Sequence, residues 1–153
     1  MQIPTRLTIA WLRHAYESGS ATPREVVARI LERCADTVDY NVWIAPPSEQ
    51  ALEPYLAQLD QTSPSADKPL WGVPFVIKDN IDLDGVPTTA ACPAYTYTPA
   101  QSATVVAKLV DAGAIPLGKA NLDQFATGLV GVRSPYGECK NALDPRLISG
   151  GSS

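Results

Sequence analysis

A short apolar run that ends in a lysine constrains the fold of this chain more than any other feature. Residues 72–80 read GVPFVIKDN, so a β-branched, apolar run lies between Gly72-Val73-Pro74 and Asp79-Asn80. This pattern predicts a short buried strand followed by a turn. Lys78 would then lie at the carboxyl end of the strand, where open α/β sheets gather functional groups and where loss of water favours the neutral, basic amine. The alternative is that Lys78 turns to solvent or pairs with Asp79.

The last five residues of the chain form a second candidate functional segment, rich in glycine and serine. They read SGGSS, from Ser149 to Ser153, and the two glycines free the backbone just before two hydroxyl groups. From composition alone, this segment is more typical of a flexible linker or a cloning scar than of a functional site. Its meaning therefore depends on what accompanies it in the rest of the chain.

Four segments taken together resemble the amidase signature family. Besides the lysine-bearing strand and the closing glycine-serine segment, they are AIPLGKANLDQFA at 114–126 and SPYG at 134–137, all in the family's order between about residues 70 and 153. Within the family, TTAACPA at 88–94 and ATGLVGVRSPYG at 126–137 most resemble the allophanate hydrolase branch. An ordered set of motifs is far more specific than any one of them.

The resemblance implies a serine hydrolase whose base is a lysine. Lys78 matches the base, and Ser152 matches the serine, preceded in the family by a cis peptide bond, that relays a proton from the nucleophile. Ala126, Thr127 and Gly128 match the segment whose backbone lines the acyl pocket, although Gly128 is equally suited to be the C-cap of a helix. The family uses no metal and no cofactor, and we expect none here.

A second lysine, Lys119, also follows a predicted strand. It matches a family position that is not the base, so we expect it to be structural. Asp79 is expected to orient the turn after Lys78 and not to transfer a proton.

In the family, the nucleophilic serine and the oxyanion-hole amides lie in a further glycine-serine segment, beyond the motif that ends here at Ser153. We therefore expect residues 1–153 to be the N-terminal part of one amidase-signature domain, with a helical layer over 1–60 and the start of the catalytic α/β core over 70–153. Because loss of a nucleophile lowers activity by several orders of magnitude, the chain alone is expected to be inactive.

The functional prediction is an amidohydrolase that cleaves a C–N amide bond, of the allophanate hydrolase type that takes part in urea degradation. One alternative is another enzyme of the family, such as a small-amide amidase or the glutaminase subunit of the tRNA-dependent amidotransferase. A second alternative, from a different class, is a non-catalytic module in which residues 150–153 bind an anion on backbone amides.

The alternation of strand and helix patterns predicts an α/β fold with parallel strand pairing, and the family resemblance implies a mixed, mostly parallel sheet flanked by helices. Helices are expected after caps at Thr8, Thr22 and Ser48, with Pro54 kinking or shortening the third, and another from Ser102 to Gly113 with Val105 and Val106 facing inward. Further strands are expected at 41–45 and 114–118, and a capped short helix at 121–125. The segments 88–98 and 127–153 lack periodicity and are expected to be loops.

Composition excludes several partners and sites. A net charge of -4 gives no electrostatic footprint for nucleic acid or an anionic membrane surface, and no apolar run is long enough to span a bilayer. Three widely spaced cysteines (Cys34, Cys92 and Cys139) and a single histidine (His14) indicate neither a disulfide framework nor a zinc site. We expect a cytoplasmic protein that acts on a small-molecule amide. A homodimer is one option for the assembly of the full-length protein.

Overall fold

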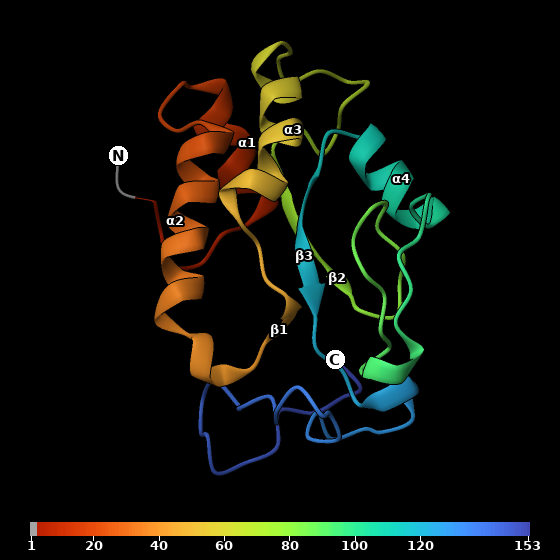
Figure 1. Ribbon diagram of the computed structural model, residues 1–153. Helices are drawn as coiled ribbons and strands as arrows, with labels where there is room; N and C mark the ends of the chain where they lie inside the picture. The colour runs from red at the N-terminus through yellow and green to blue at the C-terminus, as the bar shows by residue number, and fades with distance from the viewer. Residues whose placement is uncertain (1–2) are drawn as a thin grey trace.

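A computed structural model of the chain describes residues 3–153 and contains a three-stranded mixed sheet flanked by helices (Figure 1). The strands are β1 (Trp43–Ala45), β2 (Pro74–Lys78) and β3 (Ile115–Ala120), in the spatial order β1-β3-β2. β2 runs parallel to β3, and β1 runs antiparallel to it. The predicted α/β fold with a mixed sheet is confirmed.

Within residues 3–153, four α-helices surround the sheet: α1 (Ile9–Glu17), α2 (Pro23–Asp36), α3 (Glu49–Asp60) and α4 (Thr104–Asp111). Single turns of 3₁₀ helix lie at Val38–Tyr40, Pro93–Tyr95 and Gln124–Ala126. In Figure 1, α1, α2 and α3 lie to the left of the long strands and α4 lies to their right. The two long, parallel strands are therefore enclosed from both sides.

The first three helices begin at the caps that the sequence predicts. The hydroxyls of Thr8, Thr22 and Ser48 each accept a hydrogen bond from a backbone N–H three residues later, at 3.1 to 3.2 Å. At α2 the capping box is complete, because the Glu25 carboxylate accepts the Thr22 backbone N–H at 2.8 Å. These bonds satisfy N–H groups that the helices themselves leave unpaired.

Replacing Thr22 by alanine should lower the free energy of unfolding by about 1 kcal/mol, because the first turn of α2 loses the side chain that caps it. Urea denaturation followed by circular dichroism measures the change. Arg29→Ala, on the exposed face of the same helix, is the matched control and should change stability by less than about 0.5 kcal/mol. An equal loss in both variants would contradict the capping role.

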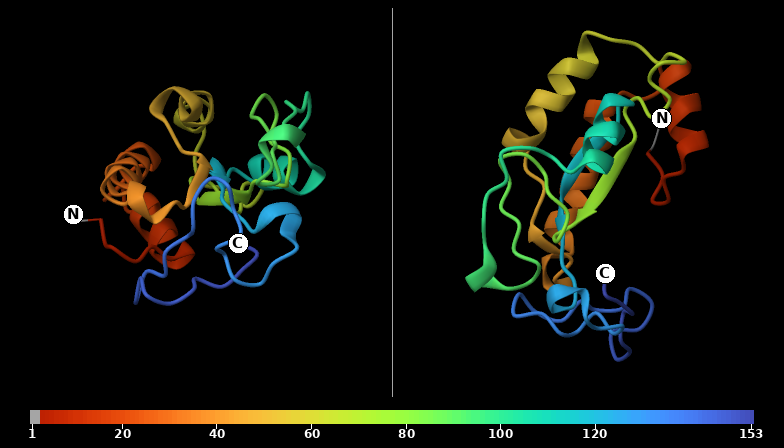
Figure 2. Two further views of the ribbon diagram at one scale, coloured as in Figure 1. Left: turned by 60° about the horizontal axis from the view of Figure 1, so that its bottom comes forward. Right: turned by 90° about the vertical axis from the view of Figure 1, so that its right-hand side faces the viewer.

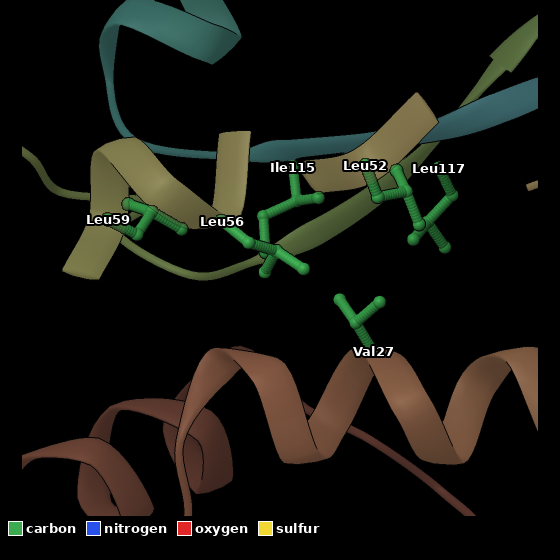
Figure 3. Close-up of a cluster of buried hydrophobic side chains, with 6 residues drawn as sticks. All are labelled: Val27, Leu52, Leu56, Leu59, Ile115 and Leu117. Atoms are coloured by element: carbon green, nitrogen blue, oxygen red, sulfur yellow. The ribbon is translucent and has the colours of Figure 1, made fainter. Parts of the chain in front are cut away.

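The main hydrophobic core lies between two helices and the central strand (Figure 3). It consists of Val27 from α2, Leu52, Leu56 and Leu59 from α3, and Ile115 and Leu117 from β3. A second cluster joins α1 to α2 around Leu12 and Val26, and a third joins Ile77 of β2 to Val106 of α4. Since both long strands are anchored in these clusters, the residues at their carboxyl ends have fixed positions.

The predicted start of the fourth helix is wrong. α4 begins at Thr104 with Ala103 as its N-cap, because the Ser102 hydroxyl accepts a hydrogen bond from the backbone N–H of Asp84 at 2.9 Å instead of capping the helix. Val105, predicted to face inward, is 56% exposed, whereas Val106 is buried as expected. The side chain of Ser102 thus connects the loop at Asp84 to the segment just before α4.

Two further predictions concern helix ends. α3 continues through Pro54 to Asp60, so the proline does not shorten it. The short helix expected at 121–125 is a 3₁₀ turn in which Phe125 has a φ of 53°. The backbone N–H of Phe125 bonds the Ala90 carbonyl at 2.9 Å, and this long-range contact turns the chain out of a helical path.

The irregular segments gather at one end of the sheet. The residues after β3, in blue in Figure 1, cross below the carboxyl ends of β2 and β3, beside the loop that follows β2. Figure 2 shows that the chain's C-terminus lies at this end in each view. The loops predicted at 88–98 and 127–153 therefore lie where functional groups collect in open α/β sheets.

Candidate active site

Lys78 and Ser152, predicted from segments far apart in the sequence, are in contact. Lys78 is the last residue of β2 and is half-buried, and its Nζ donates a hydrogen bond to the Oγ of Ser152, 74 residues further along the chain. The peptide bond between Gly151 and Ser152 is cis. An amine and a hydroxyl can each donate or accept, so this contact can carry a proton in either direction.

Ser152 is held by the residues that follow β3. Its carbonyl accepts the backbone N–H of Asp123 at 2.6 Å, and the hydroxyl of Ser153 donates to the Asn121 carbonyl at 3.0 Å. Because β2 and β3 are parallel, their carboxyl ends lie at the same edge of the sheet. The end of one strand supplies the lysine, and the end of its neighbour holds the serine.

Asp79, expected to orient the turn directly after Lys78, instead bonds a loop ten residues further along the chain. Its side chain is fully buried, and its Oδ2 accepts the hydroxyl of Thr89 at 2.7 Å and the backbone N–H of the same residue at 3.1 Å. Its Oδ1 has no hydrogen-bond partner within the described residues and lies 3.8 Å from the Nζ of Lys119. The carboxylate thus fixes the loop beyond the turn and forms a buried ion pair.

Lys119 is fully buried and has surroundings quite unlike those of Lys78. Its Nζ donates to the hydroxyl of Thr88 at 2.9 Å and more weakly to the Pro87 carbonyl at 3.4 Å. Burial lowers the pKa of Lys119, and the nearby carboxylates of Asp79 and Asp82 oppose that shift. These contacts tie β3 to the loop after β2 and agree with the structural role expected from the sequence.

The segment Ala126-Thr127-Gly128 lies close to the serine motif. Ala126 and Thr127 are exposed, whereas Gly128 is buried against the Asp123 carboxylate, which a Cβ at residue 128 would overlap. A Cβ at Gly151 would overlap the same carboxylate. Gly128 follows Thr127, the C-cap of the 3₁₀ turn, but lacks the positive φ of a glycine that caps a helix, so the alternative that Gly128 caps a helix is wrong.

Asp123 is the residue whose importance the sequence did not reveal. We expected a helix cap at 121–124, whereas the Asp123 side chain is fully buried and its carboxylate accepts three backbone N–H groups, from Val130, Gly131 and Arg133. Burial alone would raise the pKa of Asp123, but these hydrogen bonds outweigh it and lower the pKa below its ordinary value. The only sequence signal is an aspartate followed within ten residues by two glycines.

The histidine and the cysteines have no functional contact in the described part of the chain. His14 is exposed on α1, and Cys34, Cys92 and Cys139 are free and half-buried. Within residues 3–153, no group of three or more His, Cys, Asp or Glu side chains is placed to hold a metal ion. In the same range, no helix combines the length and apolar character needed to cross a membrane.

Comparisons with known proteins agree with this geometry. The family described as Amidase matches residues 25–153. The urea amidolyase of Saccharomyces cerevisiae is 47% identical over 140 residues, which cover 92% of this chain and 8% of that protein. A glutamyl-tRNA(Gln) amidotransferase subunit of Lawsonia intracellularis is 37% identical over 149 residues, which cover 96% of this chain and 30% of that protein.

Solved structures agree as well. A variant of Kluyveromyces lactis allophanate hydrolase superposes with a TM-score of 0.82 and 40% identity, covering 100% of this chain and 25% of that one. The chain therefore spans between about a tenth and a third of the length of these relatives. The match of the family over 129 of 153 residues and the identity with these relatives confirm the resemblance seen in the sequence: the chain belongs to the amidase signature family.

Proposed function

We propose that this chain is part of an amidohydrolase of the allophanate hydrolase type, with Lys78 as the base and Ser152 as the relay. The observation that carries the proposal is the hydrogen bond between the Lys78 Nζ and the Ser152 Oγ at the carboxyl edge of the sheet. The relatives named urea amidolyase and allophanate hydrolase, at 40 to 47% identity, support the choice of substrate.

The proposed chemistry is a proton relay. A serine hydroxyl is a weak nucleophile until a base removes its proton, and a neutral lysine can serve as that base. The nucleophilic serine, which in the family follows the glycine-serine motif, gives its proton to the Ser152 Oγ as its oxygen attacks the amide carbon. Ser152 passes its own hydroxyl proton to the Lys78 Nζ, which later protonates the leaving nitrogen by the reverse path.

The acyl group of the substrate is proposed to lie against Ala126, Thr127 and Gly128. Ala126 and Thr127 are exposed, and the Asp123 carboxylate connects this segment to Gly151. In this proposal residues 1–60 form the helical layer and residues 70–153 begin the catalytic core, with β1 of the first part hydrogen-bonded to β3 of the second. The enzyme would act in the cytoplasm on a small-molecule amide. A homodimer is one option for the assembly of the full-length protein.

The alternative of a non-catalytic anion site at residues 150–153 has an electrostatic objection. The Asp123 carboxylate lies directly beside Gly151, and its lowered pKa keeps it ionised at neutral pH. A second negative charge bound there would be repelled at short range in a poorly solvated site. The amidotransferase alternative does not meet this objection, but the identity of 37% to that relative is lower than the 47% to the urea amidolyase.

A pair of chimeric enzymes distinguishes the two enzymatic functions. In the first, called the hydrolase chimaera, this chain replaces its matched segment in Kluyveromyces lactis allophanate hydrolase. In the second, called the amidotransferase chimaera, it replaces the matched segment in the corresponding glutamyl-tRNA(Gln) amidotransferase subunit of Thermotoga maritima, assembled with the rest of that enzyme. Ammonia release from allophanate and from glutamine is measured for each.

The hydrolase chimaera is expected to release ammonia from allophanate, and the amidotransferase chimaera to be inactive on glutamine. Activity of the second chimaera alone would overturn the proposed function in favour of the amidotransferase. Inactivity of both, with native circular dichroism, would argue against catalytic function altogether.

A further inference from the structure

The buried carboxylate of Asp123 lies between two loops of the candidate site. Its Oδ2 accepts the backbone N–H groups of Val130 and Gly131, both at 3.0 Å, and its Oδ1 accepts that of Arg133 at 2.9 Å. Among residues 3–153 no cationic group lies within ion-pair distance of it, so the three backbone N–H groups are its direct partners, with the charge of Arg133 adding a weaker favourable interaction. A buried carboxylate in such an arrangement fixes the path of the segment that donates to it.

Two glycines, Gly151 and Gly128, pack directly against this carboxylate. A Cβ added to Gly151 would overlap the Asp123 Oδ2 and would lie 2.7 Å from the backbone nitrogens of Val130 and Gly131. At Gly128 the added Cβ would overlap the same oxygen. Only glycine permits these approaches, and the Asp123 side chain therefore packs directly against the peptide that precedes Ser152.

The main chain of Asp123 holds the next residue of the motif, Ser152, by its carbonyl. Its backbone N–H donates to the Ser152 carbonyl at 2.6 Å. The position of Asp123 is itself set by β3, because the backbone N–H of Asn121 donates to the Val42 carbonyl at 2.8 Å and Leu122 is buried. One residue thus contacts the serine motif through its carboxylate and through its backbone, and it is anchored to the sheet.

We propose that Asp123 is a positioning residue, which holds Gly151 and Ser152 so that the Ser152 hydroxyl faces Lys78. The catalytic consequence of this inference depends on the proposed function, whereas the geometric one does not. An asparagine has nearly the same shape, but its amide nitrogen would face a backbone N–H donor where a carboxylate oxygen now accepts. The loop at 130–133 would then move, and the peptide packed against the carboxylate would move with it.

The test is Asp123→Asn, in the chain itself and in the hydrolase chimaera. In the chimaera, kcat for allophanate should fall by about 10²-fold with KM unchanged, because a displacement of about 1 Å in a catalytic group has an effect of this size. In the chain, the nuclear Overhauser effect between the Lys78 and Ser152 side chains should disappear, and the amide protons of Val130, Gly131 and Arg133 should lose their protection from exchange.

The matched control is Asp60→Asn, which removes a carboxylate from a surface ion pair with Arg24 and should change none of these readouts. Unchanged kcat together with an unchanged Lys78–Ser152 Overhauser effect in Asp123→Asn would overturn the inference. If the wild-type chain already lacks that Overhauser effect, the proposed function fails at its central contact. The two failures are therefore distinguishable.

A measurement on the wild-type chain keeps the inference testable even if the variant does not fold. Couplings across hydrogen bonds, detected by long-range triple-resonance spectra, should connect the Asp123 nitrogen to the Ser152 carbonyl carbon. They should also connect the nitrogens of Val130, Gly131 and Arg133 to the Asp123 carboxylate carbon. Absence of these couplings at well-resolved positions would overturn the inference without any substitution.

Discussion

Replacing Lys78 by methionine should lower the kcat of the hydrolase chimaera for allophanate by about 10²- to 10⁴-fold, the range that a positioned general base contributes. Methionine keeps much of the length and the apolar stem of lysine but cannot accept a proton from Ser152. KM should change little, since the lysine contacts Ser152, the proposed relay, and not the proposed acyl pocket at 126–128. The melting temperature should also change little, because Lys78 is only half-buried and lies at the end of a strand.

Two further variants help to interpret the effect of Lys78→Met on kcat. Ser152→Ala interrupts the same relay and should lower kcat by a similar factor, and the double variant should be no worse than either single one, because residues that act as a unit are not additive. Lys140→Met, at an exposed lysine paired with Asp39, is the control and should leave kcat unchanged. A Lys78→Met enzyme as active as this control would remove Lys78 from the mechanism.

The parts of the fold that could be predicted are those determined by interactions between residues close together in the sequence. The caps at Thr8, Thr22 and Ser48 and the apolar run before Lys78 act on neighbouring residues, so their pattern is visible in the sequence. The start of α4 was predicted wrongly because Ser102 bonds the backbone of Asp84 instead of its own helix. Such a long-range choice leaves no local pattern.

The candidate site also contains residues that the sequence predicted and one that it did not. Composition alone favoured a linker at Ser149–Ser153, and only the ordered family motifs indicated that Ser152 meets Lys78. Asp123 remained hidden because a carboxylate that caps a helix and one that holds a distant loop look alike in sequence. The difference lies in the groups that donate to the carboxylate, which are N–H groups seven to ten residues later instead of two or three.

The second large effect is expected at Lys119, where Lys119→Met should lower the free energy of unfolding by about 3–5 kcal/mol. The substitution leaves the carboxylate of Asp79 fully buried with its Oδ1 facing no cation, and it leaves the Thr88 hydroxyl without its donor. Urea denaturation of the chain measures the loss. Lys108→Met, on the surface helix α4, is the control and should stay within about 0.5 kcal/mol of wild type.

Substitutions of the two lysines at the carboxyl ends of β2 and β3 should therefore have opposite effects. At a temperature where the Lys119→Met chimaera is still folded, its kcat per folded molecule should equal that of wild type, because the Lys119 amine bonds the loop at 87–88 and not the relay. Lys78→Met should instead keep its stability and lose its activity. A Lys119→Met enzyme that is fully folded but has lost kcat would show that the base had been assigned to the wrong strand.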